Sequence, residues 1–403
     1  MGWKLVQDSS VVLTSLPGNP GLASLGGVVE GISSTDIGAV AAMAGDRSFD
    51  LVVVGPEAPL AAGLVDALDR AEIPVFGPTR AAAQLEASKA FAKDIMRDAG
   101  VPTADWATFD DHDSAIAHLR KSSGPYVVKA DGLAAGKGVL VTDDFEAAER
   151  WAHTCLDGAF GAAGAQIVIE EFLDGPELSV FAICDGTEAV PLAPARDYKR
   201  AYDGDLGPNT GGMGSYSPVP DLPSGIVAYT MDQVVGPVLA TMAERGTPYQ
   251  GFLYTGFVLT ADGPKVLEFN CRLGDPETQV VLPRLDGSLV DLLAAAVDGG
   301  VADVTPRWLD TSTVNVVMAS EGYPKTPRTG DSIRGALDPE PDSFVFQAGT
   351  HATPGGLVTA GGRVLNVVGT GPDLASARKN AYNRVATISW PGAQYRTDIA
   401  GVS

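Results

Sequence analysis

Two lysines and three glycines fall within residues 129–138, which read Lys-Ala-Asp-Gly-Leu-Ala-Ala-Gly-Lys-Gly. Glycine lets a backbone approach a polyphosphate closely, and successive N–H groups can form an anion-binding concavity. A P-loop is excluded because position 131 is Asp, position 138 is Gly, and a strand is expected next where a P-loop needs a helix. A glycine-rich hairpin with surface lysines explains the segment equally well, so it indicates phosphate binding only together with other segments.

A second group of polar residues lies at 268–277, which read Glu-Phe-Asn-Cys-Arg-Leu-Gly-Asp-Pro-Glu. Because side chains alternate along a strand, Glu268 and Asn270 face the same way and offer oxygen ligands suited to a hard cation such as magnesium. Arg272 points to the same side, and its guanidinium can bind a carboxylate or phosphate through two hydrogen bonds. A polar strand face beside a capped turn is the competing interpretation, and it would be preferred for Glu-x-Asn alone.

The turn at residues 170–177, Glu-Glu-Phe-Leu-Asp-Gly-Pro-Glu, supplies backbone groups and an apolar surface between two strands. Glu177 is available there to bind ribose hydroxyls. By itself the segment could be any acidic turn.

Alternating apolar runs predict the elements that position these residues. Residues 51–55 predict a strand followed by a helix, and residues 75–78 predict a second strand, which together indicate a parallel α/β sheet. Thr79 is expected to cap a helix that runs to about Ala99. Strands at 126–130 and 139–142 flank the glycine-rich turn, and strands at 166–171 and 177–183 form another pair, as in an antiparallel module that carries a flexible loop.

The second half of the chain begins with a stretch rich in glycine and proline. Residues 196–223 hold nine of these residues and predict a long irregular segment, which in a compact domain is usually functional or disordered. A helix is expected near 225–245, and strands at 252–260 and 265–270 pair around a turn. Strands at 314–318, 344–348 and 364–368, then a helix from 374 to about 387, predict a separate C-terminal unit.

Composition excludes several classes of protein. The 403 residues include 28 basic and 50 acidic side chains, a net charge of −22, which repels nucleic acid and anionic lipid. Three cysteines without C-x-x-C spacing argue against a disulfide scaffold or a zinc site. No apolar run of about 18 residues and no secretion signal is visible, so we expect a cytoplasmic protein that binds neither nucleic acid nor membrane.

Taken together, these segments resemble the ATP-grasp superfamily and, within it, the phosphoribosylamine–glycine ligase family, also called glycinamide ribonucleotide synthetases. The matching segments follow family order over nearly the whole chain: 54–60, 76–79, 88–91, 129–138, 170–175, 207–214, 251–254 and 268–278. The 209–214 loop and the 270–277 segment are the most specific, because other ATP-grasp ligases do not share both.

The resemblance implies an α/β and α+β multi-domain architecture with an ATP-grasp fold. We expect an N-terminal parallel α/β domain at 1–78, an ATP-grasp domain at 79–311 with a lid at about 103–172, and a strand-rich C-terminal domain at 312–403. It also implies that ATP phosphorylates glycine and that the amine of 5-phosphoribosylamine attacks the glycyl phosphate. Glycinamide ribonucleotide, ADP and phosphate would result, a step of de novo purine biosynthesis that uses ATP with Mg²⁺ or Mn²⁺, and we expect a monomer.

The resemblance further implies roles for individual residues. Arg272, Lys129 and Asp197 are expected to be catalytic, and Glu268 and Asn270 to bind the metal. ATP is expected to contact Lys89, Lys129, Asp131, Gly132, Gly136, Lys137, Gly138, Glu170, Glu171, Leu173 and Glu177. Glycine and phosphoribosylamine are expected to contact Asn209, Thr210, Gly211, Gly212, Met213, Asp275, Pro276 and Glu277. The histidines, His112, His118, His153 and His351, fall outside every motif.

The chain departs from the family pattern at two places. Relatives usually begin with a strand and a Gly-x-Gly-Gly-Arg-Glu-His turn, whereas this sequence opens at what resembles the end of the following helix. We expect a start assigned too far downstream, because losing an inner strand would expose sheet edges and apolar helix faces. The alternatives are a ligase-dead ATP-binding protein, if the chain is truly shortened, or another ATP-grasp carboxylate–amine ligase, which the 209–214 loop argues against. The second departure is Arg196, where relatives commonly carry a neutral amide.

Overall fold

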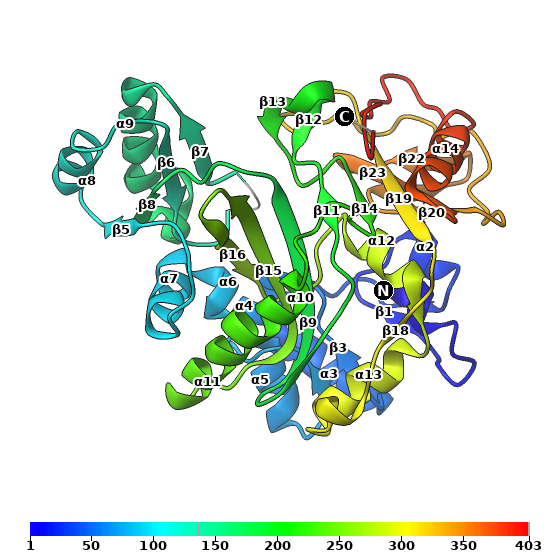
Figure 1. The fold of residues 1–403 in the computed structure, drawn as a ribbon. Helices are drawn as coiled ribbons and strands as arrows, with labels where there is room; N and C mark the ends of the chain where they lie inside the picture. Colours follow the sequence, from blue (N-terminus) through cyan, green and yellow to red (C-terminus); the bar gives the residue numbers. More distant parts are fainter. Residues whose placement is uncertain (135–136, 402–403) are drawn as a thin grey trace.

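The computed structural model describes residues 1–134 and 137–401, drawn as a ribbon in Figure 1. Its N-terminal region contains two pairs of short parallel strands, β1 (Thr14–Ser15) with β2 (Gly27–Val28) and β3 (Val52–Val53) with β4 (Val75–Phe76). The parallel pairing expected for 51–55 and 75–78 is therefore confirmed. Around these strands lie α1 (Gly2–Leu5), α2 (Pro20–Ala23), α3 (Ile37–Arg47), α4 (Glu57–Ala62) and α5 (Leu64–Arg70).

The single helix expected from Thr79 to about Ala99 is wrong. The chain instead forms two helices, α6 (Gln84–Ala87) and α7 (Lys89–Asp98), separated by Ser88 in an extended conformation. The Ser88 hydroxyl accepts a hydrogen bond from the Phe91 N–H at 3.1 Å and so caps α7. A serine that satisfies the first N–H groups of a helix favours a new start over continuation. This break places Lys89 at the N-terminus of a helix.

Residues 106–170 form an antiparallel four-stranded sheet in the order β5 (Trp106–Phe109), β8 (Ile167–Glu170), β6 (Tyr126–Ala130), β7 (Val139–Thr142). The β6–β7 pair confirms the expected hairpin, with Lys129 opposite Val139. Helices α8 (His112–Leu119) and α9 (Phe145–Thr154), followed by the helical turns Cys155–Ala159 and Gly161–Gly164, cover the sheet. The sheet and helices share a small apolar core of their own, centred on Leu119, Val128 and Ile167.

The pair expected between 166–171 and 177–183 is also wrong. Strand β8 pairs with β5 and β6, whereas β9 (Glu177–Asp185) belongs to a second antiparallel sheet in the order β10 (Ala189–Pro191), β9, β15 (Gln250–Thr260), β16 (Gly263–Asn270). Both β8 and β9 are buried along most of their length, so an apolar pattern could not distinguish the partner of either. The expected hairpin at 252–260 and 265–270 is confirmed as β15–β16.

One continuous helical run, α10 (Ile226–Thr230), η4 (Met231–Val235) and α11 (Gly236–Glu244), confirms the helix expected near 225–245. Within the described residues it is also the one helix long and apolar enough to cross a membrane. Its side chains Val234, Val238 and Met242 are fully buried in the main apolar core. The apolar composition of this run is therefore explained by core packing.

The C-terminal sheet has the order β11 (Arg196–Asp197), β14 (Gly214–Ser217), β19 (Ser312–Ala319), β23 (Arg363–Gly371), β20 (Ser343–Gln347), and α14 (Leu374–Val385) packs on β19 and β23. Its last three strands and the helix confirm the expected elements. The remaining elements here are α12 (Thr278–Val281), η5 (Leu282–Arg284), β17 (Leu285–Asp286), α13 (Leu289–Val297), η6 (Val301–Asp303), β18 (Arg307–Trp308), β21 (Thr350–Thr353) and β22 (Gly356–Thr359).

Residues 196–223 are less irregular than expected. They contain β11, β14, and a small hairpin of β12 (Arg200–Tyr202) and β13 (Leu206–Asn209) joined by η3 (Asp203–Asp205). The strand partner that orders β14 is β19, about a hundred residues later in the chain. A partner strand so distant in the sequence produces no local pattern. The prediction of an irregular segment therefore depended on the glycines and prolines.

Candidate active site

A cavity of about 700 Å³ lies between the N-terminal region, the sheet of residues 106–170, the β9–β15–β16 sheet and the C-terminal sheet. Thirteen of the expected site residues line it: Lys89, Lys129, Gly132, Gly138, Glu170, Asp197, Thr210, Gly211, Glu268, Asn270, Arg272, Asp275 and Glu277. The structure thus gathers residues from five separate sequence segments around one space.

Other expected site residues lie outside the cavity lining: Asp131, Lys137, Glu171, Leu173, Glu177, Asn209, Gly212, Met213 and Pro276. Gly136 lies outside the described residues. Two of these residues form ion pairs within the protein, since Glu171 pairs with Lys265 at 3.2 Å and Glu177 pairs with Lys199. Their expected contacts with ATP or substrates stay predictions.

Glu170 holds two lysines in place at one end of the cavity. Its two carboxylate oxygens lie 2.8 Å from Lys129 Nζ and 3.1 Å from Lys93 Nζ, and all three side chains are buried. Burial alone would raise the pKa of Glu170, but the two ammonium groups outweigh it and keep the pKa below its usual value. Lys93 was missed from the sequence, although it stands one helical turn after Lys89 on the same face of α7.

Asp131 connects the glycine-rich turn to α7. It accepts hydrogen bonds from the Ala90 N–H at 2.7 Å and from the Ser88 hydroxyl, as a carboxylate does at a helix N-terminus. Lys89 Nζ in turn donates to the carbonyl oxygens of Asp131 and Gly132, both at 3.3 Å. Burial lowers the pKa of Lys89, and the nearby Glu268 carboxylate partly offsets this.

Glu268 and Asn270 lie two residues apart on β16, which pairs with β15 through Gly256 and Tyr254. Burial would raise the pKa of Glu268, but Lys199, Lys129 and Lys89 lower it below its usual value. The site therefore offers an ionised carboxylate and an amide oxygen, which is a donor set that fits a hard divalent cation and not a soft one.

Arg272 is held by two carboxylates that sequence reasoning missed. Its guanidinium lies 3.1 Å from Glu86 Oε1 and 3.5 Å from Glu57 Oε2. Glu86 also accepts the Cys271 N–H at 2.7 Å, and burial raises its pKa to about 7 even though Arg272 acts to lower it. Glu57 lies in the segment 54–60 already noted, while Glu86 had no motif to reveal it. These contacts fix the orientation of Arg272 at the cavity wall.

The half-buried Asp197 and Lys199 and the buried Glu277 form a polar group that also lines the cavity. Burial raises the pKa of Asp197 to about 8, with Lys199 acting to lower it and Glu277 to raise it further. Lys199 has a raised pKa because Asp197 and Glu177 outweigh the effect of its burial. The Ser179 hydroxyl lies 3.2 Å from Glu277 Oε1 and 3.0 Å from the Tyr254 hydroxyl, so the group extends into β9 and β15.

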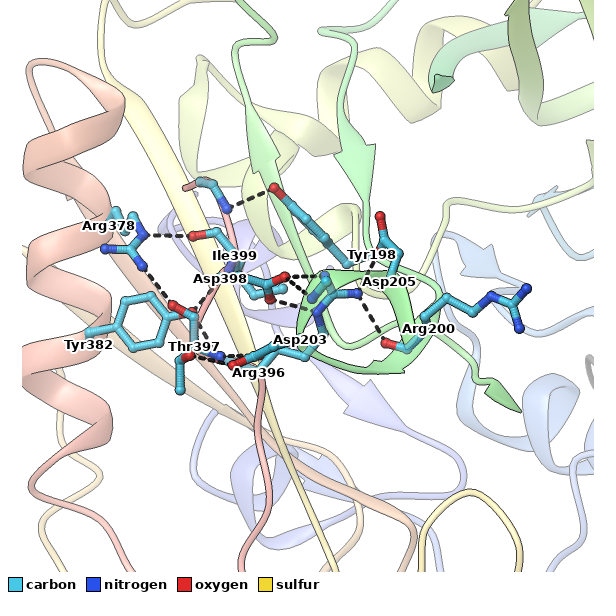
Figure 2. Close-up of polar contacts among 12 residues, drawn as sticks. Tyr198, Arg200, Asp203, Asp205, Arg378, Tyr382, Arg396, Thr397, Asp398 and Ile399 are labelled. Carbon is cyan, nitrogen blue, oxygen red and sulfur yellow. Dashed lines mark hydrogen bonds and ion pairs between the residues drawn. The ribbon is translucent and has the colours of Figure 1, made fainter. Parts of the chain in front are cut away.

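Residues near the end of the chain hold the loop that follows Asp197, as Figure 2 shows. The Arg396 guanidinium is 1% exposed and donates to Asp205 Oδ1 at 2.7 Å, to the Arg200 carbonyl at 3.2 Å and to both Asp398 oxygens. It also lies 4.7 Å from the centre of the Tyr198 ring, within cation–π distance. The η3 turn is therefore attached to the C-terminal segment through one buried cation.

Neighbouring contacts in Figure 2 reinforce this attachment. Asp203 accepts hydrogen bonds from the Thr397 N–H and hydroxyl, and the Gly204 N–H donates to Asp398 at 2.8 Å. The Ala400 N–H donates to the Tyr198 hydroxyl at 2.9 Å. We name these contacts, together with those of Arg396, the C-terminal clasp.

Arg363 on β23 holds the far end of the same loop. It donates to the Gly211 carbonyl at 2.6 Å and to the carbonyl and carboxylate of Asp275 at 2.8 and 2.9 Å. Gly212, with φ of +108°, lies so close to Pro276 that a Cβ atom there would stand 2.3 Å from the proline Cδ. The two segments judged most specific in the sequence are thus in direct contact, which only glycine at position 212 allows.

Arg196, the second departure from the family pattern, turns away from the cavity. It donates to the Glu177 carbonyl at 3.0 Å, the Tyr216 hydroxyl at 3.1 Å and Asp221 at 2.9 Å. These contacts tie β11 to β14, so the residue supports the strand that carries Asp197.

Three family models match the chain in succession. They are the N domain of phosphoribosylglycinamide synthetase over residues 1–86, its ATP-grasp (A) domain over 87–278 and its C domain over 313–401. The matches support the expected order of domains, whose limits at 78 and 311 stay predictions.

Curated relatives agree with these matches. A phosphoribosylamine–glycine ligase from Streptomyces coelicolor is 52% identical over 95% of this chain and 91% of its own length. One from Brucella melitensis is 47% identical over 99% of this chain and 94% of its own length.

Solved structures show the same relationship in three dimensions. The phosphoribosylamine–glycine ligase of Thermotoga maritima has a TM-score of 0.84 and 35% identity, covering 98% of this chain and 96% of that one. A biotin carboxylase from Campylobacter jejuni has a TM-score of 0.77 at 14% identity, covering 99% and 91%, and so shares the fold alone. The comparisons of sequence and of structure agree: this chain belongs to the phosphoribosylamine–glycine ligases, ATP-dependent enzymes with the ATP-grasp fold.

Proposed function

We propose that this chain joins glycine to 5-phosphoribosylamine in two steps within the cavity described above. In the first step a glycine carboxylate oxygen attacks the γ-phosphorus of ATP, the bond from that phosphorus to the ADP oxygen breaks, and ADP leaves. In the second step the amine nitrogen attacks the carbonyl carbon of glycyl phosphate, the carbon–oxygen bond to phosphate breaks, and the nitrogen loses a proton. Glycinamide ribonucleotide and phosphate are released.

The observation that carries this proposal is the charge arrangement around Glu268. Lys89, Lys129 and Arg272 come from α7, β6 and the residues after β16, yet all three line the same cavity and act on the pKa of this one carboxylate. Phosphoryl transfer needs such fixed positive charge around the transferred group, together with reactants held in line. We assign the two lysines to the ATP phosphates and Arg272 to the glycine carboxylate or the acyl phosphate.

Family members use ATP with a divalent metal ion, and the donor set of Glu268 and Asn270 fits one. We propose that these two residues hold Mg²⁺ or Mn²⁺, which when bound neutralises charge on the phosphate oxygens. The chain's own contribution is to keep Glu268 ionised through its neighbouring lysines.

Asp197 is suited to remove the proton from the attacking amine. A general base is most effective when its pKa lies near the working pH, and burial raises that of Asp197 to about 8. Its ionised form predominates above that pH, and cations bound nearby would extend this form to lower pH. We propose that Asp197 accepts the proton and that Thr210 and Gly211, held by Arg363, bind the phosphoribosylamine or glycine beside it.

The sheet of residues 106–170 has its own small core and contributes Lys129 and the glycine-rich turn, which supports a role for residues 103–172 as a lid over ATP. Closure of such a lid would keep water from the acyl phosphate. We further propose that the enzyme works as a monomer in the cytoplasm.

An ADP-release assay with glycine and freshly generated phosphoribosylamine tests the proposal. We expect rapid ADP formation only when both substrates are present. Formation of glycinamide ribonucleotide, followed by mass spectrometry, should match ADP one to one. ADP release that does not depend on the amine would contradict the assignment, and ATP binding without any turnover would favour a ligase-dead protein.

A further inference from the structure

Two of the four histidines lie together with a carboxylate in the lid, far from the active-site cavity. His112 begins α8, His153 lies in the last turn of α9, and Asp157 follows in the turn Cys155–Ala159. Figure 1 shows the two helices side by side at the edge of the molecule, and their contacts bring these three residues into one cluster. None of them belongs to a motif that the proposed reaction uses.

The polar atoms of this cluster lie close enough together for all three residues to reach one metal ion. One potential ligand atom from each residue lies within 4.8 Å of the other two, and His112 Nε2 lies 3.2 Å from Asp157 Oδ1. Nitrogen and oxygen ligands about 2.0–2.2 Å from a tetrahedral ion stand roughly 3.3–3.5 Å apart. The His112–Asp157 distance is therefore close to that of two atoms bound to one ion.

A hydrogen bond does not account for this contact. His112 Nε2 lies at ion-pair distance from Asp157 Oδ1, yet it is shielded from solvent and makes no hydrogen bond to any residue that the structure describes. A buried nitrogen without a hydrogen bond is costly unless another group satisfies it. A shared cation would satisfy the histidine and the carboxylate together.

The backbone around Asp157 also differs from an ordinary helix. The turn Cys155–Ala159 is interrupted at Gly158, whose φ of +91° is not helical. Asp157 lies four positions after His153, and residues at this spacing in helical turns lie on one face.

We propose that His112, His153 and Asp157 form a binding site for a zinc-type divalent ion, separate from the active-site metal ligands Glu268 and Asn270. Two imidazoles and one carboxylate suit Zn²⁺ or Co²⁺, whereas Mg²⁺ prefers oxygen ligands alone. The half-exposed position leaves room for water as a fourth ligand. A bound ion joins the start of α8 to the end of α9 and so stiffens the lid.

Equilibrium dialysis of metal-free protein against Zn²⁺ in excess Mg²⁺ tests the site. We use the Glu268→Ala variant as the background so that the active-site ligands cannot contribute. One zinc per chain with a micromolar Kd is expected, falling at least about tenfold in affinity with His112→Ala or His153→Ala. The matched control is His351→Ala, which removes an exposed histidine on β21 and should bind zinc as the background does.

A second measurement separates zinc binding from damage to the lid. Asp157→Asn keeps the side-chain shape at a mostly exposed position, and its unfolding temperature without metal should equal that of the background. Added Zn²⁺ should raise the Tm of the background and of His351→Ala, and raise it less in Asp157→Asn and His153→Ala. Equal zinc affinity in all variants, or no stoichiometric binding in the background, would overturn the proposal.

Discussion

Two glycine-rich segments border the active-site cavity, and they are attached to the protein in different ways. The turn at 131–138 is held near its ends, where the Ala130 N–H donates to the Gly138 carbonyl at 2.8 Å and the Gly132 N–H to the Ala163 carbonyl at 3.0 Å. The loop at 198–214 is held along its length by the guanidinium groups of Arg396 and Arg363, which come from distant parts of the chain.

Among the described residues, glycine content alone therefore does not determine how a segment is attached to the rest of the protein. A turn that closes over ATP needs few side-chain restraints, because each restraint would have to break during every cycle. A loop that orients an amine beside a carbonyl must be fixed in advance, since misplacement of about 1 Å can cost a hundredfold in rate. Arg363 on β23 and Arg396 near the end of the chain make contacts suited to that fixation.

The largest effect on turnover is expected at Glu268, where positive charges from both sides of the cavity converge. Glu268→Ala removes the carboxylate of the proposed metal site and should lower turnover by at least about a hundredfold. Turnover should fall far more than stability does, because Glu268 is only half-buried and Lys129 and Lys199 keep Glu170 and Glu177 as ion-pair partners. Steady-state ADP release across a magnesium titration, with Tm measured alongside, checks this. Unchanged turnover at low magnesium would remove Glu268 from the metal site.

Breaking the C-terminal clasp should leave the loop at 198–214 less firmly attached, and so more like the turn at 131–138. Arg396→Gln leaves Asp205 and Asp398 without their cation and should cost about 3 kcal/mol of stability. Because the loop that carries the amine side of the site is then free to move, kcat should fall about tenfold or more while the KM for ATP stays nearly constant.

Arg200→Gln is the matched control for the clasp, because its guanidinium makes a single hydrogen bond to the Gly207 carbonyl in the same loop. We expect nearly normal kcat and Tm for this variant. Partial rescue by Arg396→Lys would support positioning through the buried charge. Equal losses in the KM for ATP and in kcat would show a general folding defect instead.

Asp197, which precedes the loop held by Arg396 and Arg363, allows a test based on the pH dependence of the rate. Its pKa in the folded protein is raised to about 8, so the carboxylate that accepts a proton is present above this pH and is lost as the pH falls through it. The kcat/KM for phosphoribosylamine should therefore rise with pH up to a limit at or below about 8. In Asp197→Asn the rate should be lower and this dependence absent. A wild-type slope that survives the substitution would assign the titration to another group.

The smallest effect is expected at Lys137, in the proposed lid. Its side chain is exposed and lies outside the cavity lining, so Lys137→Ala should change the free energy of unfolding by less than about 0.5 kcal/mol. If the turn closes over ATP, the loss of one charge should raise the KM for ATP several-fold. A KM identical to that of the wild type would show that this lysine does not reach the nucleotide.

Much of the active site could be predicted from the sequence because its residues lie in compact segments. Glu268, Asn270 and Arg272 follow the alternation of one strand, and Lys129 lies near the end of another. The resemblance to a known family was therefore enough to predict that these residues lie around one site. Glu86 and Lys93 could not be found in this way. Their importance depends on burial against Arg272 and Glu170, and these partners lie far away in the sequence.

Prediction of the fold from the sequence was limited in the same way. The β6–β7 and β15–β16 hairpins were predictable because each joins strands that are neighbours in the chain. The partners of β8, β9 and β14 were not, since fully buried strands carry no pattern that identifies which sheet they join. The break between α6 and α7 was not predicted because it depends on a single residue. Ser88 caps α7, whereas the residues on both sides favour one continuous helix.

The C-terminal clasp also sets an order for assembly during protein synthesis. The Thr397–Asp203 contact joins residues 194 positions apart, so at about 5–20 residues per second the ribosome needs roughly 10–40 s to supply its second half. Lys89, Lys129, Glu268 and Asn270 have all been made before then. A nascent chain could therefore contain the proposed nucleotide and metal ligands while the loop beside Asp197 is still unattached, and the ability to react would come last.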